Sequence, residues 1–243
     1  TDFADLNNDL FNDLVTLDMV SESHVRSKEN MASMSTSNFM NMVKVGYHHS
    51  YMANMLFYNV GNGKFQETAQ LSGIAKTDWS WAPLIADFDN DGNKDIFVTN
   101  GVDRDYTNQD SRRILKGVMA RSESMSLESL LNTFPSEKMS NYIFKNNGNL
   151  KFEKKIEEWG LLDPGFSYGA AYADLDNDGD LDLITNNIDD PAGIYRNNSN
   201  NNYLQVELKG PKTNPFGIGA SIYLVNENIT QFQQLYMARG YKS

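Results

Sequence analysis

The feature that most constrains the fold is an Asp-rich segment that occurs three times with the same internal spacing. The three segments cover residues 5–13, 87–95 and 174–182. The second and third begin 87 residues apart, and the same offset aligns residues 56–100 with 143–187 without a gap. The repeating unit is therefore larger than the acidic segment, and a repeat architecture has to account for most of the chain.

Short stretches of alternating apolar residues surround each acidic segment and predict β-strands. In the third unit they lie at 167–173, 181–185, 193–196 and 203–208, separated by Asn- and Gly-rich turns. Four antiparallel strands that repeat with turn-rich connections are typical of a β-propeller blade. We therefore expect an all-β fold with three blades, at about 1–78, 79–165 and 166–201.

Two stretches interrupt the strand pattern and are expected to be insertions, each between the second and third strands of its blade. They cover residues 18–54 and 102–141. In the second, Ser126 precedes apolar residues at helical spacing, which are Leu127, Leu130, Leu131 and Phe134. The first is rich in methionine, and such a cluster more often fills an irregular core than forms an adaptable binding surface. Its methionines are Met19, Met31, Met34, Met40, Met42 and Met52.

Carboxylates at alternate positions of one tight turn repel one another unless a cation neutralises them. Calcium prefers six to eight hard oxygen ligands, which positions 1, 3, 5 and 9 and a backbone carbonyl at position 7 would supply. Gly at position 6 allows the sharp turn. We therefore expect two or three calcium sites. Their ligand positions are Asp5, Asn7, Asp9, Phe11 and Asp13; Asp87, Asp89, Asp91, Asn93 and Asp95; and Asp174, Asp176, Asp178, Asp180 and Asp182. The first is expected to be the weakest, because it has Asn7 and Leu10 where the others have Asp and Gly.

Acidic segments of this kind have three other interpretations. An EF-hand needs a bidentate Glu at position 12 and flanking helices, but that position is Thr16, Val98 or Thr185 and the flanks favour strands. Magnesium rarely uses a cage built only of protein ligands. A single Asp/Asn/Gly cluster can be an ordinary turn without metal. Three clusters in the same register favour calcium.

The charge of the chain excludes several classes of function. The net charge is −11 and the pI is about 4.7, which argues against binding to a nucleic-acid backbone. The acidic segments hold 3, 4 and 5 Asp residues, so three calcium ions would bring the net charge to about −5. Cys is absent and His occurs three times, so thiolate metal sites and disulfides are excluded and zinc is not expected. No apolar run is long enough for a transmembrane segment.

The repeated segments resemble a known family. Residues 86–92 and 173–179, each between a small-residue strand and an apolar strand, resemble FG-GAP/VCBS repeats of integrin-type β-propellers. Residues 202–210, 214–220 and 240–243 are similar to the start of an ASPIC/UnbV domain, so 202–243 is expected to be a truncated β segment of that kind. The resemblance implies a calcium-stabilised extracellular propeller of the cartilage-acidic-protein type, best represented among surface and secreted proteins of Bacteroidetes-like bacteria. It also implies about seven blades in a complete ring.

These features predict a non-enzymatic recognition, adhesion or scaffold module, outside the cell or on a bacterial outer-membrane surface. The expected partner is a protein or glycan, another chain that completes the propeller through its open sheet edges, or an outer-membrane complex. The alternative is a component that binds or processes surface polysaccharide. The chain begins at Thr1 with no signal peptide, so we expect a processed product or an excised segment.

No residue is expected to be catalytic. His48 and His49 are adjacent, so in an extended segment they point in opposite directions, which suits a structural or contact role. Trp79 and Trp81 could stack a sugar or form a protein hot spot, but packing within the blade is the more common role. Trp81 aligns with Tyr168 of the next unit and is expected to pack, so we expect Trp79 to be the exposed member of the pair. The possible ligand contacts are therefore Trp79, His48 and His49.

Overall fold

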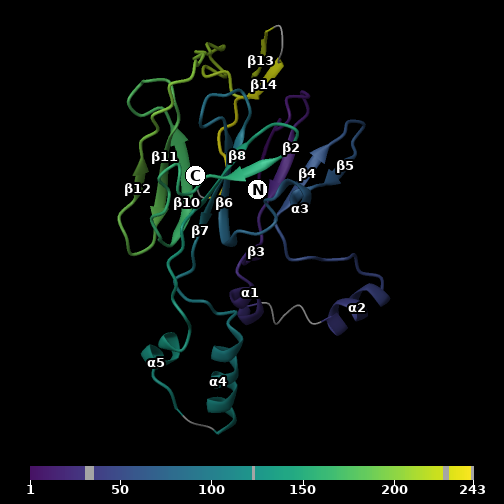
Figure 1. The fold of residues 1–243 in the computed structure, drawn as a ribbon, viewed down its shortest axis with the longest axis vertical. Helices are drawn as coiled ribbons and strands as arrows, with labels where there is room; N and C mark the ends of the chain where they lie inside the picture. Colours follow the sequence, from purple (N-terminus) through teal and green to yellow (C-terminus); the bar gives the residue numbers. More distant parts are fainter. Residues whose placement is uncertain (31–35, 122–123, 227–229, 242–243) are drawn as a thin grey trace.

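The computed structural model describes residues 1–30, 36–121, 124–226 and 230–241, and its main body consists of three antiparallel sheets side by side (Figure 1). We call these sheets blades 1, 2 and 3. Blade 1 has the order β1(Asp2–Ala4), β2(Asp13–Thr16), β4(Met55–Asn59), β5(Phe65–Glu67). Blade 2 has the order β3(Met19–Val20), β6(Asp78–Ala86), β7(Asp95–Asn100), β8(Tyr142–Asn146), β9(Phe152–Lys154). Blade 3 has the order β10(Ser167–Ala173), β11(Asp182–Asn187), β12(Gly193–Tyr195). The expected all-β architecture of propeller blades is confirmed.

Strand β7 explains how the blades are held together. All six of its residues are buried, because another blade covers each face of blade 2. Side chains alternate between the faces of a strand. Ile96 and Val98 pack in one core with Leu56 of blade 1, whereas Phe97 packs in a second core with Leu183 of blade 3. The continuous apolar run of β7 is therefore that of a strand buried on both sides.

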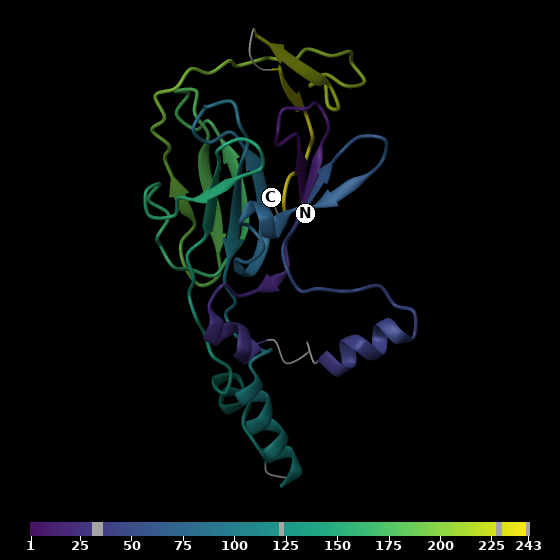
Figure 2. The same ribbon diagram turned by 45° about the vertical axis from the view of Figure 1, so that its right-hand side comes forward.

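The helical insertions lie at the end of the sheets opposite to the acidic loops (Figures 1 and 2). The first insertion contains α1(His24–Asn30) and α2(Thr36–Lys44), and the second contains α4(Gln109–Ala120) and α5(Leu127–Asn132). A single further turn, α3(Ala69–Ser72), follows β5. Ser126 is the N-cap of α5 and accepts a hydrogen bond from the N–H of Ser129.

Arg26 of α1 connects the two insertions to blade 2. Its guanidinium lies 2.8 Å from Asp78 at the start of β6, 2.5 Å from Glu137 and 3.6 Å from Asp105. The Arg26 side chain is only 11% exposed and that of Asp105 2%. An ion group buried to this degree fixes the position of α1, because each charge depends on the others for compensation.

The expectation that the methionine cluster fills core is wrong for three of its members. Met19, Met40 and Met42 are 42%, 51% and 49% exposed, and Met52 is half-buried. Helix α2 has no buried residue and extends away from the sheets in Figure 2. Its methionines are exposed because no sheet face lies against this helix. Met31 and Met34 lie outside the described residues.

The expected fourth strand of blade 3 is also wrong. Residues 203–208 form no strand, and Leu204 and Val206 are exposed. The chain leaves blade 3 because Ser199 Oγ and Asn201 Nδ2 both donate hydrogen bonds to the carbonyl of Asp89, at 2.9 and 2.7 Å. These bonds direct it across the acidic loop of blade 2. Blade 2 in turn gains a strand, because β3 of the first insertion pairs with β6.

The C-terminal part begins with a hairpin of β13(Ser221–Val225) and β14(Thr230–Gln234), at the same end as the acidic loops (Figure 1). The chain then returns along the first strands of the blades, where the Arg239 guanidinium lies 3.6 Å from the buried Asp2 carboxylate. Gly240 is required there, because its φ is +67° and a Cβ would lie 2.7 Å from the carbonyl oxygen of Pro83. No helix in the described part of the chain is long and apolar enough to cross a membrane.

Candidate functional site

The three acidic segments form loops of one design, which connect β1 to β2, β6 to β7 and β10 to β11. We call residues 5–13 loop 1, 87–95 loop 2 and 174–182 loop 3, and number the positions of each from 1 to 9. In loop 2 the carboxylate of Asp87, at position 1, accepts hydrogen bonds from the N–H groups of Asp91 (3.0 Å) and Gly92 (2.8 Å). The same two bonds recur at 3.1 and 2.9 Å in loop 1 and at 3.2 and 3.1 Å in loop 3. The position 1 carboxylate therefore shapes the turn itself.

The carboxylate at position 9 ties each loop to a more distant part of its blade: the end of β4, the end of β8, or the residues just after β12. Asp95 is fully buried, and it accepts one bond from the N–H of Phe88 (3.0 Å) and another from the N–H of Asn146 (2.8 Å). Loops 1 and 3 repeat both bonds with Asp13 and Asp182. Sequence reasoning identified position 9 as a ligand and missed this second, structural role.

Burial and crowding raise the pKa values of these carboxyl groups. Removal from water is the main cause, and neighbouring carboxylates add to it while the N–H bonds oppose it. The pKa of Asp95 is raised to about 8, and those of Asp87 and Asp13 to about 6. The loops therefore hold negative charge that the protein alone compensates only in part.

Two backbone positions of the loops lie in the left-handed region. The residue at position 4 is Asn in every loop, with φ of 55–60°, a conformation that Asn tolerates. At position 6, Gly92 and Gly179 have φ of 93° and 94°, but Leu10 has 75°. Loop 1 thus keeps the conformation of the other loops in spite of a side chain that disfavours it.

Asn side chains link each loop to the next. Asn8 Nδ2 donates to the carbonyl of Gly92 (3.0 Å), and Asn90 Nδ2 donates in the same way to the carbonyl of Gly179 (3.2 Å). Asn146, at the end of β8, adds a second link, because its Nδ2 donates to the carbonyls of Leu6 in loop 1 (2.7 Å) and Lys94 in loop 2 (3.0 Å). The three loops therefore form one hydrogen-bonded face.

Carboxylates at positions 1, 3 and 9 converge in two of the loops. In loop 2 each of Asp87, Asp89 and Asp95 offers an oxygen within 4.8 Å of the others, and in loop 3 the same holds for Asp174, Asp176 and Asp182. Loop 1 has Asn7 at position 3, so it lacks the third carboxylate of such a group. Positions 5 and 7 are not members of either group.

Some buried side-chain oxygens lack a hydrogen-bond partner and are available to a metal ion. Among the described residues these include Asn7 Oδ1 and Asp89 Oδ1, both at position 3, and Asp180 Oδ1 at position 7. A buried polar atom without a partner is costly, so three of them at expected ligand positions need an explanation. Hard oxygen donors around a turn are the ligands that Ca²⁺ takes. The residues present therefore fit a calcium ion.

Loops 2 and 3 are each contacted by one basic side chain that the sequence analysis did not identify. Lys145 Nζ binds the carboxylates of Asp89 and Asp91, and Arg196 lies 2.7 Å from Asp176 and 3.4 Å from Asp178. Burial disfavours the charged ammonium of Lys145, but its hydrogen bonds to the two carboxylates outweigh this and raise its pKa. Both residues directly precede the Asn that binds position 9, so the repeat alignment was the signal that could have found them.

None of the three possible ligand contacts lies in an acidic loop. Trp79 is half-buried near the start of β6, and His48 and His49 are exposed beyond α2. Trp81 packs on Tyr168 of blade 3, with ring centroids 4.5 Å apart, and its indole N–H donates to the carbonyl of Gly101. Trp81 is therefore a packing residue between blades, as expected.

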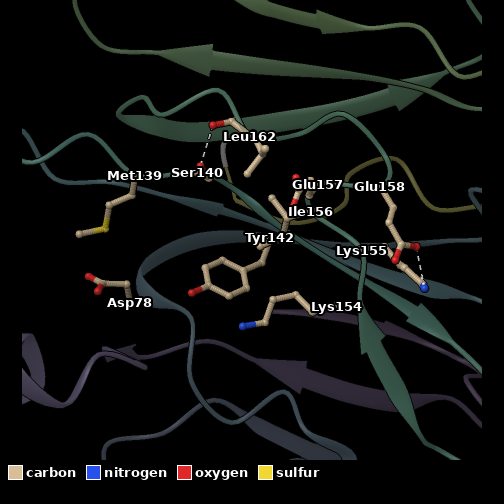
Figure 3. Close-up of a pocket in the computed structure, with 10 residues that line it drawn as sticks. All are labelled: Asp78, Met139, Ser140, Tyr142, Lys154, Lys155, Ile156, Glu157, Glu158 and Leu162. Atoms are coloured by element: carbon tan, nitrogen blue, oxygen red, sulfur yellow. Dashed lines mark hydrogen bonds and ion pairs between the residues drawn. The ribbon is translucent and has the colours of Figure 1, made fainter.

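A cavity of about 600 Å³ lies at the end of blade 2 near the insertions (Figure 3). Four of its five charged side chains have protein partners: Lys154 lies 2.6 Å from Glu22, Lys155 lies 2.7 Å from Glu158, and Asp78 binds Arg26. The fifth is Glu157. The cavity therefore presents mainly the ring of Tyr142 and the apolar side chains of its rim, which gives no convergent set of polar groups for a ligand.

Comparison with known proteins agrees with the loop geometry. Residues 43–98 and 130–185 match the FG-GAP-like repeat family, and the two matches are offset by the same 87 residues as the loops. The chain contains FG-GAP-like repeats. Each match ends just after an acidic loop, so loops 2 and 3 lie inside the matched segments and loop 1 lies outside them.

One curated relative matches a larger part of the chain. Cartilage acidic protein 1 of Mus musculus is 29% identical over 202 residues, which are 70% of this chain. The chain spans only 31% of the length of that relative. Together with the repeats, this similarity supports the FG-GAP plus ASPIC/UnbV architecture expected from the sequence.

Proposed function

We propose that the chain is a calcium-binding β-propeller module of an extracellular or cell-surface protein, with a role in recognition, adhesion or scaffolding and no catalysis. The observation that carries the proposal is the convergence of three carboxylates in each of loops 2 and 3, next to buried oxygens that lack a partner. FG-GAP-like repeats and the cartilage acidic protein relative support an extracellular location. The recognised partner is a protein or a glycan at the cell surface.

In this proposal Asp87, Asp89 and Asp95 hold one ion, with Asp91 and the carbonyl of Asn93 completing the set. Asp174, Asp176, Asp178, Asp180 and Asp182 hold the second. Loop 1 binds most weakly, through Asp5, Asn7, Asp9, Asp13 and the carbonyl of Phe11. Calcium supplies the positive charge that the crowded carboxylates lack, so the face formed by the three loops becomes rigid and can present a fixed surface.

The blade boundaries at about 1–78, 79–165 and 166–201, with insertions 18–54 and 102–141, are part of the same proposal. Residues 202–243 would begin the ASPIC/UnbV-like unit, of which the β13–β14 hairpin is the ordered element. Its contacts with the loops, such as Asn12 Nδ2 to the Tyr236 hydroxyl at 3.2 Å, support a position beside the face formed by the three loops.

The test is a thermal melt in EDTA, in millimolar calcium and in millimolar magnesium, with bound metal counted by elemental analysis. We expect two calcium ions per chain, or three if loop 1 binds, and a melting temperature that rises with calcium and not with magnesium. An ion that binds only the folded state stabilises it by about 2.7 kcal/mol per site at 100 times its Kd.

The variant Asp89→Asn with Asp176→Asn removes one ligand from each group of three and should abolish most of the calcium shift. Asp163→Asn removes an exposed carboxylate outside the loops and should leave the shift unchanged. A chain without bound calcium and without a calcium-dependent shift would refute the proposal.

A further inference from the structure

Each blade places one side chain from the same position of the repeat beside its acidic loop. It comes from the residue just before the Asn that binds position 9, and it contacts the loop at position 3 or 5. In blade 2 it is Lys145 and in blade 3 Arg196. In blade 1 it is Tyr58, whose hydroxyl accepts from Asn7 Nδ2 (3.0 Å) and lies 3.3 Å from Asp9. We call this the pre-Asn position.

The charge at the pre-Asn position follows the charge of the loop. Loop 1 carries three Asp residues and faces a neutral tyrosine, whereas loops 2 and 3 carry four and five and face a cation. Asp89 and Asp176, which the two cations contact, are also members of the converging groups. The basic side chains therefore engage carboxylates that a divalent ion would need.

We propose that Lys145 and Arg196 are internal counter-cations, which neutralise the loops when no divalent ion is bound and compete with that ion for the same carboxylates. This inference rests on the proposed calcium-binding function. The two cations let loops 2 and 3 stay folded at low calcium, and they set the calcium affinity below what the carboxylates alone would give. Calcium binding then releases Lys145 and Arg196 from position 3, so the position of the pre-Asn side chains depends on whether the loops hold calcium.

The two counter-cations differ in strength. The Lys145 side chain is 23% exposed and its partners Asp89 and Asp91 are 24% and 26% exposed, so water screens this contact only in part. Arg196 is 66% exposed and is screened more strongly. Loop 3 also keeps a further carboxylate at position 7, where loop 2 has Asn93. Loop 3 should therefore bind calcium more tightly than loop 2.

The test compares Lys145→Met and Arg196→Met with the unmodified chain by calorimetric titration with CaCl₂ at low ionic strength. A unit charge about 5 Å from a divalent ion in water changes its affinity by roughly tenfold. We expect Lys145→Met to raise the calcium affinity of loop 2, the weaker of these two sites, by about tenfold. Arg196→Met should raise the calcium affinity of loop 3 by about threefold. Lys154→Met is the matched control: it removes a lysine that pairs with Glu22 and should change neither affinity.

A melt in EDTA gives a second readout. Without calcium, Lys145→Met should lower the melting temperature, because the carboxylates of loop 2 lose their counter-charge, and the calcium-induced rise should become larger than in the unmodified chain. If the unmodified chain binds calcium but Lys145→Met strengthens no site beyond the control, the inference is overturned while the proposed function stands. If no variant binds calcium, the proposed function fails as well.

Discussion

The position 9 carboxylate should be essential for folding even when no metal is present. Asp95 is fully buried and accepts hydrogen bonds from the N–H groups of Phe88 and Asn146, both of which are buried residues. Asp95→Ala would leave both N–H groups without an acceptor. Each buried donor left in this state costs about 1–3 kcal/mol, so the free energy of unfolding should fall by about 2–6 kcal/mol. In Asp95→Asn the amide oxygen can keep one bond, and the loss should be about half as large.

Asp91→Ala is the matched control for this prediction. Asp91 belongs to the same loop, but no buried N–H group depends on it: its side chain accepts from the N–H of Asn93 in the exposed turn and contacts Lys145. Loss of a surface ion pair and a solvated hydrogen bond should cost about 1 kcal/mol or less.

The assay is urea unfolding followed by circular dichroism, in EDTA at pH 6. Burial raises the pKa of Asp95 to about 8, so at pH 6 its carboxyl group is mostly protonated in the folded chain. The comparison then measures the hydrogen bonds and not the relief of charge repulsion. Equal unfolding midpoints for Asp95→Ala and Asp91→Ala would refute the structural role of position 9.

Three further predictions concern pH, the insertions and loop 1. Because the pKa values of Asp87 and Asp95 are raised, the folded chain keeps protons that the unfolded chain has lost above about pH 4. The free energy of unfolding in EDTA should therefore fall as pH rises toward 8, and calcium should remove most of that fall. Urea unfolding from pH 5 to 8 checks this, and a free energy of unfolding that rises with pH in EDTA would contradict it. Arg26→Ala should destabilise the insertions by about 3–5 kcal/mol, because it leaves the Asp105 carboxylate buried without a compensating charge. The expected readout is that proteolysis within residues 18–54 is faster in Arg26→Ala than in Arg26→Lys. Leu10→Gly relieves a left-handed Leu and should raise stability by about 0.5–1 kcal/mol in a urea titration, whereas a loss would show that the Leu10 side chain contributes more than its strain costs.

Much of the architecture could be predicted because its determinants are local. The 87-residue offset, the short apolar runs of β7 and β11 and the Asx-rich turns depend on neighbours along the chain, so the strands and loops follow from short patterns. Ser126 likewise marked the start of α5. The methionines of α2 show the limit of this reasoning, because composition does not say whether a sheet face lies against a helix.

The same limit applies to blade 3 and to the C-terminal segment. Residues 203–208 have the alternation of a strand, but hydrogen bonds from Ser199 and Asn201 to Asp89, more than 100 residues earlier, direct the chain elsewhere. The contact of Arg239 with Asp2 joins the two ends of the chain. Neither contact leaves a trace in local sequence, because each depends on how separate blades pack.

The sequence by itself determined the repeat, the blade pattern and which carboxylates could hold a cation. Only the tertiary structure decided which of them converge, namely positions 1, 3 and 9, and which basic residues oppose them. The reason is that ligand spacing along a turn is a local property, whereas Lys145 and Arg196 come from later parts of the chain. Lys145 lies on β8, 50 residues after position 9, and Arg196 directly follows β12, 14 residues after position 9. The distance between those charges is set by strand pairing, and that distance governs how strongly they act on a bound ion.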